Sequence, residues 1–330
     1  MSKKTYMILP FVLATLLLLF MSASPVFTSN SGSTDTNSVS SQATPEAAQL
    51  MTGLRAGIAP PANFDPLAAS AAQLKEYGFP ARPTNHARLS AWIDVMGHAK
   101  HYDIPKQAPS TAVHNQYGST QYSSNLAGYV AQGSINGGEP YSDATAIRTQ
   151  PGYSGSSDPS FWVGLGGFTT NDLVQAGADS NAIAAGGSTQ YEFWLEDYPE
   201  GTVWEANPVL YSGDRVYVDV TYNGSNSTAY FEDYTTGHYS MVYFNAPYYD
   251  GSTADLINEA VGATYNNWTS WGITSFSQGS SVESNGYEVT LTSANDTMID
   301  MTNNGTSSGT PETDTSSIND STDGFTATAE

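Results

Sequence analysis

Between about residue 119 and residue 301 the sequence consists of short runs in which apolar and polar residues alternate. Gly, Asn and Asp residues separate these runs, and no apolar repeat of helical period spans the region. Alternation directs successive side chains to opposite faces of a strand, so each run can bury one face. This pattern predicts an all-β protein, a two-sheet antiparallel sandwich or a barrel. The runs lie at 127–135, 161–165, 191–195, 215–221, 229–232, 240–244, 273–276 and 287–291.

The strands must form their core without covalent crosslinks, because the chain contains no cysteine. Disulfides, thiolate metal sites and cysteine nucleophiles are therefore excluded. Six Trp, 12 Phe and 21 Tyr residues supply large apolar side chains, so aromatic packing can stabilise the core instead.

Acidic residues outnumber basic ones by 32 to 10, and most of the excess lies in one part of the chain. Residues 119–330 carry two cations against 26 acids, whereas residues 25–118 carry six of each. A surface this negative repels nucleic acids and anionic membranes, so neither is expected as a partner. Only 13% of residues are charged, which favours an acidic environment, where carboxylates become neutral, over adaptation to salt.

The N-terminus has the pattern of a secretory signal. Lys3 and Lys4 precede an apolar run at 6–21, and small residues follow at 22–24. Because a membrane-spanning helix needs about 20 apolar residues, we expect residues 1–24 to be a cleaved signal peptide. The protein would then be secreted and extracellular. The alternative is a retained membrane anchor.

Two further segments flank the predicted sandwich. Residues 25–118 are interpreted as a pro-segment with two short helices, the alternative being a small accessory domain. Asp65, followed by Pro66, predicts the start of a helix at 67–77, and Asn85 predicts the N-cap of a second helix that ends at Gly97. Residues 302–330 are rich in Ser, Thr, Asp and Gly, which predicts a disordered tail.

Seven short motifs follow one another within residues 122–292. They are Trp-Val-Gly-Leu at 162–165, Leu-Val-Gln-Ala-Gly at 173–177, Trp-x-Glu-x-Tyr-Pro at 194–199, Ser-Gly-Asp-x-Val-x-Val at 212–218, Glu-Asp-x-Thr-Thr-Gly at 232–237, Ala-Asp-Leu-Ile-Asn-Glu at 254–259 and Trp-Gly-Ile-Thr-x-Phe at 271–276. Their order and spacing resemble the glutamic peptidases, or eqolisins, which are secreted acid endopeptidases. The resemblance implies a concanavalin-like, jelly-roll type β-sandwich at 119–301 and polypeptide substrates. We further expect a monomer, a zymogen with an intramolecular pro-segment, and no cofactor or metal.

The resemblance also implies a catalytic pair, formed by Gln175 and by Asp255 at the position where the family has Glu. Peptide hydrolysis without a metal or a covalent intermediate requires an activated water and a donor for the oxyanion. Asp255 could take the proton from water and return it to the leaving amine, while the Gln175 amide donates to the oxyanion. The alternative is that Gln175 is a buried structural glutamine and Asp255 a turn residue.

Three positions depart from the family pattern: Asp255 replaces Glu, Leu126 replaces a cleft Trp and Asp197 replaces another Trp. An Asp carboxylate is set back by one methylene, and a misplacement of about 1 Å can reduce a rate about 100-fold. Glu259 cannot substitute, because four residues along a strand span about 13 Å. The chain is therefore either a peptidase that uses Asp or a relative with impaired catalysis.

Other residues are expected to support the pair. Glu196 corresponds to a strand glutamate of the family, and we expect it to position Gln175. Trp162 and Trp194 are expected in the core or the cleft wall, and Glu259 on the same strand face as Asp255.

A second hypothesis is a carbohydrate- or surface-binding module, since similar sandwiches bind polysaccharides; a structural surface protein is a third. A glycosidase is disfavoured, because Glu192 and Glu196 would lie about 13 Å apart, beyond the separation of glycosidase carboxylates. His238 is the one histidine after residue 118, which disfavours a metal site or a serine triad.

The charge distribution suggests a pH-dependent pro-segment. At neutral pH the cations of residues 25–118 would attract the acidic sandwich, so we expect this segment to lie over the acidic cleft. In acid the carboxylates would become neutral and the four histidines of the segment would gain charge, which predicts its release. The alternative is a passive linker.

Overall fold

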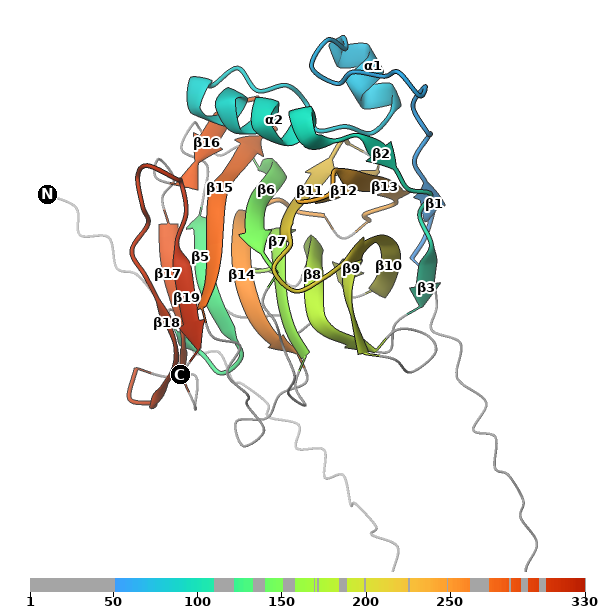
Figure 1. Ribbon diagram of the computed structural model, residues 1–330. Coiled ribbons are helices and arrows are strands. Elements are labelled where there is room, and N and C mark those ends of the chain that lie inside the picture. Colours follow the sequence, from blue (N-terminus) through green and yellow to red (C-terminus); the bar gives the residue numbers. More distant parts are fainter. Residues whose placement is uncertain are drawn as a thin grey trace, which may run out of the picture. The chain divides into compact units, whose positions relative to one another are not determined.

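The computed structural model describes residues 51–109, 122–132, 140–150, 158–168, 170, 172–183, 189–198, 200–224, 226–247, 249–261, 273–284, 286–291, 296–302 and 307–329 (Figure 1). The predicted signal peptide at 1–24 and the following residues 25–50 lie outside this part of the chain. Among the described residues, neither helix is long and apolar enough to cross a membrane.

Sheet A is formed by strands that are distant in the sequence. Its order is β16 (Glu288–Thr290), β15 (Ile273–Glu283), β6 (Tyr141–Thr149), β11 (Arg215–Tyr222), β12 (Ser227–Asp233) and β13 (His238–Phe244), all antiparallel. Two short strands from the N-terminal region extend its edge at β13, namely β1 (Arg55–Ala56), antiparallel, and β2 (His101–Tyr102), parallel.

Sheet B faces sheet A. Its order is β17 (Asp296–Thr302), β5 (Leu126–Gln132), β14 (Thr253–Val261), β7 (Asp158–Gly166), β8 (Leu173–Ile183), β9 (Thr189–Tyr198), β10 (Gly201–Leu210) and β3 (Gln107–Pro109), again antiparallel. A small sheet C links the two through β4 (Tyr122–Ser123), β17, β18 (Pro311–Thr315), β19 (Thr326–Ala329) and β15. The predicted two-sheet antiparallel sandwich is confirmed.

The main core lies between the two sheets, and alternation explains which side chains enter it. On β8, Val174, Ala176 and Ala178 belong to this core, whereas Leu173 belongs to a separate cluster on the outer face of sheet B. On sheet A, Val218 and Val220 contribute in the same way. The outer face of sheet B is therefore free of the main core and carries the residues discussed below.

An N-terminal layer, defined here as residues 51–109, packs against the outer face of sheet A. It contains helices α1 (Ala71–Glu76) and α2 (His86–His98), and α2 crosses the strands of sheet A in Figure 1. Asn85 caps α2 as predicted, accepting from the backbone N–H groups of the first turn. The prediction for the first helix is wrong in its start, because Ser70 and Gln73 form a capping box that begins the helix at residue 71.

The prediction that the pro-segment lies over the cleft is also wrong for the described residues. They cover sheet A, whereas the predicted catalytic pair lies on sheet B. The physical reason is the burial of apolar area. The layer buries Trp92, Val95 and Met96 against tyrosines of sheet A, and the free energy of this burial exceeds that of the long-range attraction between net charges.

The predicted disordered tail is instead part of the fold. Strands β18 and β19 lie within 302–330, and β19 pairs with β15. Phe325 is buried and stacks on Phe276, with ring centroids 4.6 Å apart. Composition is misleading here, because ladder hydrogen bonds and one aromatic anchor order a segment whose side chains are otherwise small and polar.

Candidate active site

One row of directly opposed residues crosses sheet B and contains both members of the predicted pair. Asp255 on β14 is opposite Gly164 on β7, Gly164 is opposite Gln175 on β8, and Gln175 is opposite Glu196 on β9. The row continues to Thr202 on β10. Directly opposed residues in antiparallel strands point to the same face, so the row brings these side chains together.

Two hydrogen bonds join one half of this row. Gln175 Nε2 donates to Glu196 Oε2 over 2.7 Å, and Thr202 Oγ1 donates to Glu196 Oε1 over 3.0 Å. Gln175 and Glu196 are fully buried, and Thr202 nearly so. The carboxylate of Glu196 therefore orients the Gln175 amide. The amide nitrogen points toward β9, and the amide oxygen does not take part in this hydrogen bond.

Thr202 is a site residue that the sequence reasoning missed. A tight turn connects β9 to β10, with the backbone N–H of Glu200 donating to the carbonyl of Asp197 over 2.5 Å and Gly201 at a φ of 127°. This turn sets the register that places Thr202 opposite Glu196. The Pro-Glu-Gly sequence at 199–201 is a turn signal that could have indicated it.

Gly164 separates Asp255 from Gln175. Two interstrand spacings place their backbones about 10 Å apart, and the glycine between them contributes no side chain. A Cβ at this position would lie 2.9 Å from Leu173 Cδ1, 3.1 Å from Trp162 Cζ3 and 3.4 Å from Gln175 Cβ. The glycine thus lets Leu173, Trp162 and Gln175 pack closely at this point of the row.

The predicted tryptophans flank the row and are held by hydrogen bonds. Trp162 Nε1 donates to Glu259 Oε2 over 3.0 Å, and Trp194 Nε1 donates to Ser160 Oγ over 2.9 Å. Gly177 lies between the two rings, where a Cβ would approach Trp194 Cε2 to 2.9 Å. Glu259 therefore anchors the wall of the site and does not replace Asp255.

The residues that replace the family's tryptophans are also buried. Leu126 packs in the same apolar cluster as Trp162 and Trp194. Asp197 alternates with Glu196 along β9 and so points to the opposite face of the sheet. Leu126 shares the face of the row but lies opposite Glu259, four residues along β5 from the residue opposite Asp255.

Glu192 lies four residues before Glu196 and is opposite Asp179. Burial raises the pKa of its carboxyl, an effect that Lys106 partly offsets. Within the described ranges, no three His, Asp or Glu side chains are grouped so as to hold a metal ion.

Comparisons with known proteins agree with the sequence motifs. The sequence profile of the Peptidase A4 family matches residues 124–323, more than half of the chain. A comparison with curated proteins finds no match.

Among solved structures, scytalido-glutamic peptidase with a peptide-based transition state analog is 20% identical, with a TM-score of 0.49 and coverage of 63% of this chain and 100% of that chain. SCP-B, a member of the Eqolisin family in a complex with the tripeptide Ala-Ile-His, is 19% identical, with a TM-score of 0.48 and the same coverage. Aspergilloglutamic peptidase from Aspergillus niger is 25% identical, with a TM-score of 0.43, covering 53% and 100%. On the extent of the profile match, this chain belongs to the Peptidase A4 family, the glutamic peptidases or eqolisins.

Proposed function

We propose that this member of a peptidase family is a secreted acid endopeptidase in which Asp255 and Gln175 act on one water molecule. The observation that carries the proposal is the row on sheet B, in which the buried amide and the carboxyl group share a face across a residue without a side chain. Family membership supports polypeptide substrates.

The Gln175 amide is prepared for a ligand by its own hydrogen bonds. Its nitrogen donates to Glu196, whereas its Oε1 is buried and has no hydrogen-bond partner in the described part of the chain. Leaving a buried acceptor unsatisfied costs about 1–3 kcal/mol. A water or substrate group bound beside Gly164 would satisfy this oxygen, and the second N–H of the amide would remain available to an oxyanion.

The proposed reaction follows from these groups. Asp255 takes a proton from the water, the water oxygen attacks the peptide carbonyl carbon, and the Gln175 N–H donates to the oxyanion. Collapse of the tetrahedral species breaks the C–N bond, and the proton on Asp255 passes to the leaving amine. Glu196 and Thr202 hold the amide in place throughout.

The direct test is hydrolysis of denatured casein at pH 2–4 with pepstatin and a chelator present. We expect activity in the wild type and its loss in Gln175→Ala and in Asp255→Asn, the latter keeping the shape of the side chain. Full activity in both variants would contradict the proposed pair. Trp162 and Trp194 are fully buried in the described part of the chain, so stacking on a sugar would have to use other aromatic residues.

Secretion and processing are part of the proposal and rest on the sequence. The signal-like residues 1–24 imply export, and a mature N-terminus found after residue 24 by Edman degradation or mass spectrometry of the secreted protein would support it.

A further inference from the structure

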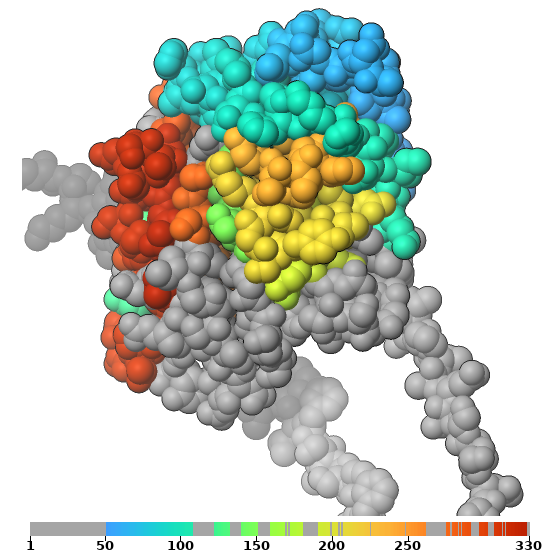
Figure 2. Space-filling view, in the orientation of Figure 1, coloured from blue at the N-terminus to red at the C-terminus, as the bar shows by residue number. Residues whose placement is uncertain are grey.

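The N-terminal layer has the kind of contact with sheet A that is usual for a permanent interface. Its buried apolar residues and those of sheet A form one cluster (Figure 2, where the blue and cyan atoms of the layer lie on yellow and orange strands). From the layer the cluster includes Leu74, Phe79, Trp92, Val95 and Met96, and from the sheet Ile147, Tyr217, Tyr230, Tyr239 and Met241. The indole of Trp92 is satisfied within the layer, donating to the carbonyl of Pro80 over 3.0 Å.

Backbone pairing continues the layer into both sheets. Strands β1 and β2 extend sheet A at β13, and β3 extends sheet B at β10, with Gln107 opposite Glu205. These strands cover edges of the sandwich that would otherwise be open to pairing with other chains.

Carboxylates of the sandwich also accept backbone N–H groups of the layer at three separate places. The pairs are Glu200 with Thr52 (3.0 Å), Glu288 with Thr84 and Asn85 (2.6 and 2.7 Å), and Glu205 with Lys106 (2.5 Å). Charge-assisted hydrogen bonds of this kind are stronger than neutral ones. The layer is therefore attached at its beginning, middle and end.

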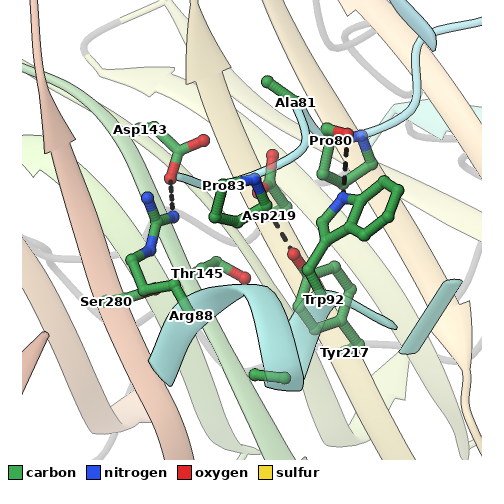
Figure 3. Close-up of a pocket in the computed structure, with 11 residues that line it drawn as sticks. Pro80, Ala81, Pro83, Arg88, Trp92, Asp143, Thr145, Tyr217, Asp219 and Ser280 are labelled. Atoms are coloured by element: carbon green, nitrogen blue, oxygen red, sulfur yellow. Dashed lines mark hydrogen bonds and ion pairs between the residues drawn. The ribbon is translucent and has the colours of Figure 1, made fainter. Parts of the chain in front are cut away.

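Beneath α2 lies a small cavity of about 20 Å³, shown in Figure 3, which is lined by both apolar and charged side chains. Arg88 reaches from the helix to Asp143, with Nη2 and Oδ1 3.2 Å apart, and Asp219 lies beside them on the next strand. Asp219 accepts from Thr221 over 2.8 Å and from Tyr217 over 3.3 Å. One buried cation thus faces the buried carboxyl groups of Asp143 and Asp219, and its Nη1 lies 3.8 Å from Glu288 Oε2.

Pro80, Pro83 and Trp92 of the layer line the same cavity as Asp143 and Asp219, so the layer shields these two carboxyl groups from water. Burial raises the pKa of Asp219 well above its usual value, and the neighbouring Asp143 adds to the effect, while Thr221, Arg88 and Tyr217 oppose it. Burial likewise raises the pKa of Asp143, against the opposing influence of Arg88 and Thr221. Both groups therefore bind protons more readily when the layer is docked.

Two further carboxyl groups at the interface behave in the same way. Burial raises the pKa of Glu232 to about 8, with Tyr230 and Lys100 lowering it and Asp233 and Asp94 raising it. Burial raises the pKa of Glu205 to about 7, whereas the hydrogen bonds from Lys106 and Gln107 of the layer lower it, so protonation of Glu205 weakens these two contacts.

Two contacts oppose this trend. Burial favours the neutral form of Glu288, but its hydrogen bonds from Thr84 and Asn85 outweigh that effect and lower its pKa, so acid weakens this contact. His101 of the layer and His238 of sheet A have ring centroids 4.8 Å apart and repel when both are charged, although Asp103 lies 2.9 Å from His238. The raised pKa values of Asp219, Asp143 and Glu232 act in the opposite direction, because each of these groups is buried where the layer meets sheet A.

We propose that the outer face of sheet A is a docking surface for residues 51–109 that keeps this segment bound as a separate chain after the connection to the sandwich is cut, and binds it more tightly as the pH falls. Docking takes up protons, so lowering the pH favours the docked state. This is the opposite of a pro-segment released in acid, and it does not depend on the identity of the catalytic pair.

The test uses the full chain with a recognition sequence for a specific protease inserted between Pro109 and Tyr122. After cleavage at pH 6, the dissociation of the N-terminal piece is followed by size-exclusion chromatography after dilution at pH 4, 6 and 8. We expect the two pieces to elute together at pH 4, and dissociation to be at least about tenfold slower at pH 4 than at pH 8, the factor that corresponds to one pKa unit.

Separation at pH 4, faster dissociation at pH 4 than at pH 8, or a rate that does not depend on pH would each overturn the proposal. Asp219→Asn and Glu232→Gln remove two proton-binding groups while keeping their shape, and both should slow dissociation at pH 8 and reduce the pH dependence. Glu76→Gln removes an exposed carboxylate of the layer and should change nothing. If a variant fails to fold, the dissociation rates of the wild-type pieces at pH 4, 6 and 8 still decide whether the proposal holds.

Discussion

Replacing Thr202 by valine would remove one hydroxyl from the row on sheet B while keeping the branched shape of the side chain. The hydroxyl donates to Glu196 Oε1, and the other oxygen of this carboxylate accepts from Gln175. We expect the variant to fold, with one fewer hydrogen bond holding Glu196 in place against the Gln175 amide.

The size of the effect follows from burial. A hydrogen bond to a charged group contributes about 1.5–3 kcal/mol when its loss leaves a buried partner unsatisfied. For a domain of this size each kcal/mol shifts the melting temperature by about 2–4 °C, so we expect a decrease of about 3–12 °C. A shift of the amide by about 1 Å can reduce kcat about 100-fold, while KM should change little because the hydroxyl of Thr202 acts on the amide only through Glu196.

The assay is casein or peptide hydrolysis across pH 2–6, with melting measured on the same samples. Thr202→Ser restores the hydroxyl and should recover most of kcat, which separates positioning from packing. If Thr202→Val keeps wild-type kcat and stability, or if serine fails to rescue the loss of kcat, then Thr202 does not position Glu196.

Three further variants test the site and the buried acids. Gly164→Ala should lower kcat/KM for a peptide substrate at least about tenfold, because its Cβ would lie 2.9 Å from Leu173 Cδ1 beside Gln175. The control, Gly97→Ala in α2, should leave kcat/KM unchanged and be neutral or stabilising by up to about 1 kcal/mol. Asp255→Glu should keep or raise casein hydrolysis at pH 2–4, because the longer side chain restores the carboxylate position of the family. A loss of activity would contradict the proposal that the shorter Asp side chain limits the rate. The melting temperature should be highest below pH 4.5 and should fall as the pH rises toward 8, because the raised pKa of Glu232 means that its deprotonation destabilises the folded state. Glu232→Gln should abolish up to about 5 kcal/mol of the decrease in the free energy of unfolding between pH 4 and pH 8, which denaturant unfolding at the two pH values would measure.

Alternation in the sequence was sufficient to predict the sheets and the face on which each candidate residue lies. Gln175 shares its face with Leu173, and Asp255 with Glu259, since side chains alternate along any strand. A different local rule, the preference for Asn at the N-cap of a helix, predicted the cap at Asn85. Local signals of this kind need no knowledge of which strands become neighbours.

Composition was a poorer guide where order depends on distant partners. The polar residues of 302–330 fold because β19 pairs with β15 and Phe325 stacks on Phe276. The position of residues 51–109 likewise depends on a complementary apolar face that forms only when β6, β11, β12 and β13 come together. Net charge predicted an attraction but not the place of contact.

What the sequence determined by itself is the set of residue types on each strand face, together with the motif order that identifies the family. Only the tertiary structure decided that Asp255, Gly164, Gln175, Glu196 and Thr202 stand in one row, because strand register is fixed by pairing between segments up to 91 residues apart. It also decided that Arg88 faces Asp143, across 55 residues of chain. Pairing energies depend on burial, which arises only when the sheets pack, so these contacts have no local signal in the sequence.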